Sequence, residues 1–85
     1  MAYQLFIRRS AEKEIADIPK PIRSRVADKI HALSDEPRPS GCKKLSGEDR
    51  AWRIRIGDYR VVYEVNDAEK YIEIRVVAHR KDVYR

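Results

Sequence analysis

The fold is decided by residues 51–65, which read AWRIRIGDYRVVYEV. In both halves of this stretch large apolar side chains occupy every second position, and Arg53, Arg55 and Arg60 fall between them. Because successive side chains of a strand point to opposite faces, each half predicts a strand with one apolar face. The Gly-Asp pair at 57–58 is typical of a tight turn. The stretch therefore predicts an antiparallel hairpin with its arginines on the face away from the core.

Working outward, the same kind of pattern predicts two more strands and two helices. One segment before the hairpin and one after it alternate between apolar and polar residues, as strands do. Between the first of these strands and the hairpin, two segments carry apolar residues at helical spacing, and a loop with Pro and Gly follows them. In chain order these are strand 2–8, helix 10–18 with Ser10 as its N-cap, helix 21–35, loop 36–50 and, after the hairpin, strand 71–79. The order β-α-α-β-β-β predicts the α+β class: a two-helix hairpin packed on one face of a small, mainly antiparallel four-stranded sheet.

Alternation also assigns side chains to the two faces of this sheet. The core is expected to contain Ile15, Ile18, Val26, Ile30, Leu33, Trp52, Ile54, Val61 and Ile74. In the last strand the helix-covered face is expected to carry Ile72, Ile74, Val76 and Ala78. The opposite face is then expected to carry Tyr71, Glu73, Arg75, Val77 and His79.

Length and composition limit the class of protein. The chain has 85 residues, which predicts a single domain, 1–85, and its net charge of +5 predicts an anionic partner. No apolar run exceeds three residues, whereas a membrane span needs about 20. We therefore expect a soluble cytoplasmic protein with no membrane partner. The single cysteine, Cys42, and the two histidines match no known zinc-ligand spacing, so we expect no disulfide, metal or cofactor.

Positive charge is expected to gather on the sheet face away from the helices. The acids expected there are Glu64 and Glu73. The basic residues expected there are Arg53, Arg55, Arg60, Arg75 and His79. One interpretation is an ordinary solvated face, because a sheet with one side in water needs polar residues on that side. The excess of arginine, whose planar guanidinium matches phosphate oxygens, favours a nucleic-acid-binding face.

Three motifs resemble the RelE/ParE toxin superfamily. They are KLSG at 44–47, the hairpin stretch from Trp52 to Val65, and HRKDVY at 79–84. The last motif is similar to the RelE branch in particular. The resemblance covers nearly the whole chain and implies the fold of RelE-like microbial ribonucleases.

The resemblance implies the toxin of a type II toxin–antitoxin system. RelE-like toxins enter the ribosomal A site and cut the mRNA there by attack of a ribose 2′-OH on the adjacent phosphate, without a metal, and so inhibit translation. Carried over to this sequence, the family's catalytic positions fall on Arg53, Arg55, Arg60, Arg80 and Tyr84, with His79 as a candidate for proton transfer. The residues expected to bind RNA are Lys43, Lys44, Arg75 and Lys81.

The chain departs from the best-studied family pattern at Arg53 and Arg55, where that pattern has lysines and one lysine is a candidate general base. Arginine stays protonated at any working pH and cannot accept a proton. The groups left for proton transfer are His79, Tyr84, Glu64 or a group of the ribosome. Two other functions therefore stay open: a ParE-like inhibitor of DNA gyrase, and a non-catalytic module that binds RNA or a partner. The ending with Arg80 and Tyr84 favours the nuclease.

The resemblance also implies partners. These are the ribosome and mRNA, an antitoxin with an acidic toxin-binding segment, and operator DNA only through the toxin–antitoxin complex. The antitoxin could pair its carboxylates with Arg53, Arg60 or Arg80. Alternatively, an amphipathic helix could pack along the toxin and displace Tyr84 from the sheet, which is the mode that we expect.

Overall fold

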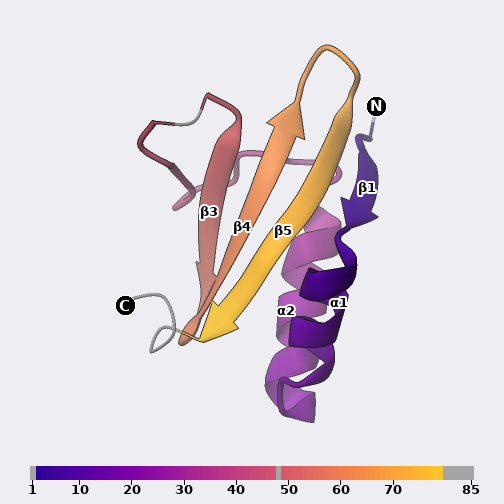
Figure 1. Cartoon of the computed structure of the whole chain (residues 1–85), viewed down its shortest axis with the longest axis vertical. Helices are drawn as coiled ribbons and strands as arrows, with labels where there is room; N and C mark the ends of the chain where they lie inside the picture. The colour runs from indigo at the N-terminus through magenta and orange to yellow at the C-terminus, as the bar shows by residue number, and fades with distance from the viewer. Residues whose placement is uncertain (1, 48, 80–85) are drawn as a thin grey trace.

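The computed structural model describes residues 2–47 and 49–79. Within these ranges two helices and a five-stranded sheet form two layers, with both helices against one face of the sheet (Figure 1). The elements are β1 Gln4–Ile7, α1 Arg9–Ala16, α2 Lys20–Ala32, β2 Lys43–Lys44, β3 Ala51–Ile56, β4 Tyr59–Asn66 and β5 Tyr71–His79. The predicted α+β class and helical hairpin are therefore confirmed. No helix in the described ranges is long and apolar enough to cross a membrane.

The sheet has the strand order β1-β5-β4-β3-β2, in which only the pair β1–β5 is parallel. The predicted hairpin is confirmed as β3–β4, with Ile56 opposite Tyr59 across the turn. The predicted number of four strands is wrong. The fifth strand, β2, pairs with β3 inside the segment that was expected to be loop. Two residues are too few for alternation to be recognised, so only the pairing reveals this strand.

The ends of the elements also differ from the sequence-based bounds. Ser10 lies inside α1, and the N-cap is Arg8, which makes no side-chain capping hydrogen bond. The C-cap of α2 is Leu33, so this helix ends before the predicted Asp35. The residues after it form turns and bends that lead to β2. These differences move no apolar residue out of the core.

The core lies between the helices and the sheet. Apolar side chains from both helices and from β3, β4 and β5 form one buried cluster. Of the predicted core residues, Ile15 and Trp52 are partly buried at its margin. The others are buried within it: Ile18, Val26, Ile30, Leu33, Ile54, Val61 and Ile74. Because the register of β3 sends Trp52 and Ile54 inward, Arg53 and Arg55 are left on the outer face of the sheet.

A β-bulge interrupts the pairing of β4 with β5. Val62 pairs with Val76, whereas the next residue of β4 pairs with Ile74, so Arg75 is the extra residue. One extra residue exchanges the faces of every side chain that follows it. Accordingly, Val77 is buried at 3% exposure, whereas Val76 is 39% exposed.

The predicted faces of the last four residues of β5 are therefore wrong. Val77 and His79 lie on the helix-covered face, and Val76 and Ala78 lie on the outer face, opposite Val62 and Arg60 of β4. Alternation within a single strand cannot reveal a bulge, because the bulge depends on how the neighbouring strand pairs.

Candidate functional site

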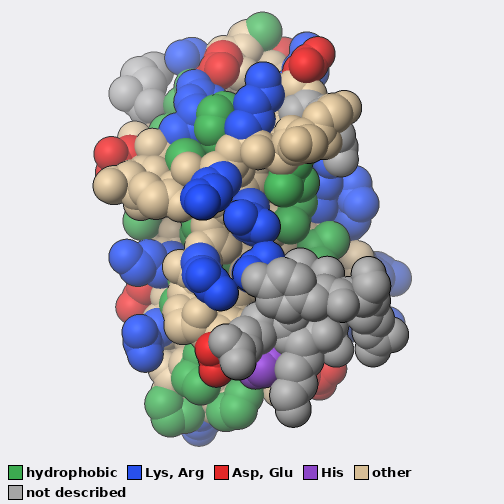
Figure 2. Space-filling model, turned by 90° about the vertical axis from the view of Figure 1, so that its left-hand side faces the viewer, with side chains coloured by type: hydrophobic (Ala, Val, Ile, Leu, Met, Phe, Trp, Pro, Cys, Tyr) green, Lys and Arg blue, Asp and Glu red, His purple; other side chains and the backbone are tan. Residues whose placement is uncertain are grey.

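The outer face of the sheet carries a concentration of basic side chains. Arg53 and Arg55 lie two residues apart on β3 and share this face, and Arg60 of the neighbouring strand lies directly opposite Arg55. Figure 2 shows lysine and arginine side chains gathered down the middle of this face. The structure thus brings together three arginines that the sequence predicted to share one face of the sheet.

These arginines line a small pocket together with a lysine. The pocket has a volume of about 180 Å³ and is lined by Gly41, Lys43, Arg53, Arg55 and Arg60; we call it the cationic pocket. Lys43 enters it because β2 pairs with β3 so that Lys43 is the partner of Arg53. Gly41 has a φ of 92°, a left-handed conformation that L side chains rarely adopt, as the chain turns into β2. Sequence analysis missed the contribution of Gly41.

The electrostatics of the cationic pocket favour an anion. Like charges directly opposite each other on neighbouring strands repel. The strand pairing places Lys43 opposite Arg53 and Arg55 opposite Arg60, so both pairs experience this repulsion. Among the described residues no carboxylate forms an ion pair with Lys43, Arg53 or Arg55. Arg60 is only 6% exposed, so water screens its charge less than that of an open side chain. A bound phosphate would relieve this repulsion, and guanidinium groups can contact its oxygens in pairs.

The loop before β2 is fixed from two sides. The buried Tyr63 hydroxyl donates a hydrogen bond of 2.7 Å to the carbonyl of Pro37, and burial raises the pKa of Tyr63, so this hydroxyl keeps its proton. Arg38 lies 5.5 Å from the ring centre of Trp52 and donates a 3.0 Å hydrogen bond to Asp67. These contacts hold the segment that delivers Lys43 to the pocket.

Two other predicted RNA-binding residues lie outside the cationic pocket. Lys44 is the partner of Trp52, whose side chain packs against the core, so it belongs to the other face of the sheet. Arg75 donates a 3.0 Å hydrogen bond to Glu64, which also accepts one of 3.4 Å from the Tyr71 hydroxyl. Glu64, a candidate for proton transfer, is thus occupied by an ion pair. The roles of Lys44 and Arg75 stay predictions.

His79 lies on the face of the sheet opposite to the predicted one. The centre of its ring lies 5.2 Å from that of Tyr59 in an edge-to-face arrangement. His79 also lines a cavity with Pro19, the N-cap of α2, and with Ile22 of that helix. The prediction that His79 shares a face with Arg53 is therefore wrong, because of the bulge in β5. Arg80, Lys81 and Tyr84 lie outside the described residues.

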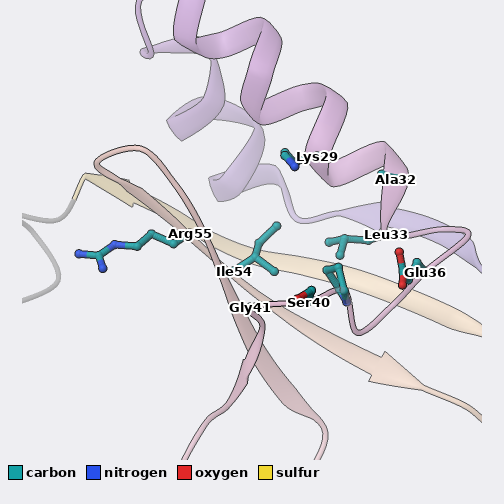
Figure 3. A pocket seen from close by; sticks show the side chains of 9 residues that line it. Lys29, Ala32, Leu33, Glu36, Ser40, Gly41, Ile54 and Arg55 are labelled. Atoms are coloured by element: carbon teal, nitrogen blue, oxygen red, sulfur yellow. The ribbon is translucent and has the colours of Figure 1, made fainter.

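A second hollow adjoins the cationic pocket but differs in chemistry. It has a volume of about 340 Å³ and lies between the end of α2, the loop before β2, and β3 (Figure 3). Leu33 and Ile54 contribute apolar surface to it. Figure 3 shows Ile54 and Arg55 leaving β3 on opposite sides, with Lys29 reaching from α2. Gly41 and Arg55 line both hollows. Acidic and basic groups are mixed around this one, so phosphate chemistry fits the cationic pocket better.

Comparison with known proteins decides the family. The model of the ParE toxin of type II toxin-antitoxin systems, parDE, matches residues 5–84. The chain belongs to this family of type II toxins. The toxin is 33% identical to the toxin RelE3 of Methanocaldococcus jannaschii over 85% of its own length and 84% of that relative's.

Solved structures of RelE proteins share the toxin's fold. RelE in the archaeal RelE–RelB complex of Pyrococcus horikoshii superposes with a TM-score of 0.84 at 33% identity, covering 94% of the toxin and 97% of that chain. The isolated RelE toxin of Escherichia coli superposes with a TM-score of 0.80 at 26% identity, covering 92% of the toxin and 84% of that chain. The predicted membership of the RelE/ParE superfamily is therefore confirmed.

Proposed function

We propose that the toxin is an endoribonuclease that enters the ribosomal A site and cleaves the mRNA there, which inhibits translation. The observation that supports this most strongly is the cationic pocket, where Arg53, Arg55, Arg60 and Lys43 line one space with room for a phosphate group. The pocket lies on the face of the sheet away from the helices, and among the described residues this face could admit an extended RNA strand. The relatives and structural neighbours named RelE support the same assignment.

The proposed reaction is attack of a ribose 2′-OH on the adjacent phosphate. Negative charge grows on the phosphate oxygens as the five-coordinate transition state forms. Arg53, Arg55 and Arg60 are already oriented by neighbouring strands, so stabilising this charge requires little rearrangement. The arginines cannot transfer protons, so this chemistry needs further groups from the toxin or the ribosome. Arg80 and Tyr84 are proposed to complete the site, and no metal is proposed to take part.

We further propose that a cognate antitoxin restrains the toxin. The Pyrococcus horikoshii and Escherichia coli RelE proteins have been crystallised as complexes with RelB. An antitoxin segment that is rich in carboxylates would suit the exposed cations, and operator DNA would be contacted through the toxin–antitoxin complex. Action on mRNA in ribosomes implies a cytoplasmic location.

The name of the matching family favours a second function. The model that matches residues 5–84 carries the name of the ParE toxin, and inhibition of DNA gyrase is the corresponding alternative. A nuclease needs the cationic pocket to hold a phosphate during bond breaking, whereas a gyrase inhibitor needs only a protein-binding surface. The two functions therefore differ in their target: the nuclease cuts mRNA, whereas the inhibitor blocks the activity of DNA gyrase.

One experiment separates these functions. Purified toxin is added to translating ribosomes carrying a defined mRNA, and in parallel to gyrase with relaxed plasmid. We expect cuts within the A-site codon, giving a 2′,3′-cyclic phosphate and a 5′-hydroxyl, with supercoiling unaffected. Intact mRNA together with blocked supercoiling would establish the gyrase alternative. Intact mRNA with normal supercoiling would leave a binding module.

A further inference from the structure

The cationic pocket contains one side chain that differs from the others in its proton chemistry. Its cations are three guanidinium groups, from Arg53, Arg55 and Arg60, and one ammonium group, from Lys43. A guanidinium keeps its protons throughout the working pH range, whereas an ammonium group can donate a proton and recover it from water. All four residues can thus stabilise negative charge, but only Lys43 among them can transfer a proton.

The position of Lys43 fits a role at the reacting phosphate. It is the cross-strand partner of Arg53, so the two side chains leave β2 and β3 on the same face. Glu64 is held in its ion pair with Arg75, and His79 lies on the other face. Among the described residues that line the cationic pocket, Lys43 is the only one whose side chain can give up a proton and take it back.

We propose that Lys43 is the general acid that protonates the departing 5′-oxygen during RNA cleavage; this inference rests on the proposed nuclease function. The 2′-oxygen forms a bond to phosphorus and loses its proton to water. The bond from phosphorus to the 5′-oxygen breaks, and its electron pair stays on that oxygen, which takes a proton from the Lys43 ammonium. The resulting amine is protonated again by solvent. The products are a 2′,3′-cyclic phosphate and a 5′-hydroxyl.

This assignment separates the roles within the cationic pocket. Arg53, Arg55 and Arg60 would hold the non-bridging oxygens, and Lys43, from the edge strand, would face the leaving group. Arginine at both central positions of β3 then needs no proton-transfer capacity, because the lysine next to them in the sheet supplies the donor. An edge strand is also suited to this task, since its lysine stays exposed and can exchange protons with water.

The test uses full-length toxin on translating ribosomes and measures single-turnover cleavage. Lys43→Arg keeps the positive charge but removes the donor, and Lys13→Arg, on an exposed part of α1, is the matched control. We expect the Lys43 variant to cleave about 10²–10⁴ times more slowly, the usual contribution of general acid catalysis, and the control to match the wild type. Thermal unfolding and ribosome binding of each variant are measured beside the rates.

A second substrate identifies which proton Lys43 transfers. An mRNA with sulfur in place of the bridging 5′-oxygen at the mapped cleavage position has a leaving group that needs no proton. We expect the wild type and Lys43→Arg to cleave it at similar rates. A Lys43→Arg rate close to that of the wild type on ordinary mRNA, or an equal deficit on both substrates, would overturn the assignment while leaving the nuclease function standing. Failure of the wild type to cleave ordinary mRNA would overturn both.

Discussion

Arg75 donates a 3.0 Å hydrogen bond to Glu64 across β4 and β5, and the two side chains form an ion pair. The pair lies on the same face as the cationic pocket, yet its charges cancel each other. Positive charge on this face is therefore not uniform: it is concentrated where Lys43, Arg53, Arg55 and Arg60 meet.

This pair gives a first prediction about RNA binding. Removing both partners, in Arg75→Gln with Glu64→Gln, should weaken binding to single-stranded RNA less than Arg53→Gln alone. The reason is that the double change leaves the net charge unaltered. Binding is measured over a range of salt concentrations, where loss of one phosphate contact lowers the logarithmic slope by about 0.7. An equal loss from the double variant would mean that Arg75 contacts RNA directly, as the sequence alone led us to expect.

A second prediction concerns the hydrogen bond between Tyr63 and Pro37. Tyr63→Phe removes the only polar atom of a side chain that is 0% exposed, and leaves the Pro37 carbonyl without this donor. We expect a loss of about 1–2 kcal/mol in the free energy of unfolding. Urea unfolding measures it. Tyr71→Phe serves as the comparison, because the hydroxyl of Tyr71 makes a longer bond of 3.4 Å and should contribute less; equal losses would contradict this account of the loop.

A third prediction concerns the attachment of α1 to the sheet. The Glu14 carboxylate accepts a 2.8 Å hydrogen bond from the backbone N–H of Val77, beyond the last pairing of β1 with β5 at Ile74. Glu14→Ala should reduce the free energy of unfolding by about 1–3 kcal/mol, since a partly buried N–H loses its acceptor. Glu14→Gln keeps an acceptor oxygen and should lose much less. Similar losses for both variants would show that the carboxylate charge matters more than the hydrogen bond.

A fourth prediction concerns the pH dependence of stability. Hydrogen bonds from Tyr3, at 2.6 Å, and from Arg38 hold the pKa of Asp67 below its ordinary value of 3.8. A lowered native pKa means that this carboxylate stabilises the fold above the ordinary value, and that the contribution disappears as the pH falls through the lowered pKa. Because Asp67 is well exposed, we expect Asp67→Asn to lose less than about 1 kcal/mol at neutral pH. Chemical unfolding at several pH values should show the difference vanishing in acid, and a constant difference would contradict the prediction.

Much of the fold follows from side-chain periodicity. The alternation in residues 51–65 predicted the hairpin and the shared face of Arg53, Arg55 and Arg60, because the apolar positions of each strand must face the core. The helical stripes predicted the residues that cover the other face, including Val26 and Ile30. The catalytic role of the arginines was carried over from the family and stays a prediction.

What the sequence did not predict depends on pairing between strands. The bulge at Arg75 exchanged the faces of Val77 and His79, and no signal within β5 marks it. The short strand β2 likewise becomes visible only through its pairing, which brings Lys43 but not Lys44 to the arginines.

The most direct test of the account is the single-turnover rate of mRNA cleavage on translating ribosomes by Arg60→Ala. If the cationic pocket stabilises the phosphate in the transition state, the rate should fall by about 10²–10³, as is typical when one oriented donor is removed. Lys13→Ala, which removes an equal charge from α1 on the other side of the sheet, should cleave at nearly the wild-type rate. Thermal unfolding confirms that both variants are folded. Equal losses from the two variants, or an undiminished rate for Arg60→Ala, would contradict the assignment of the cationic pocket as the site of cleavage.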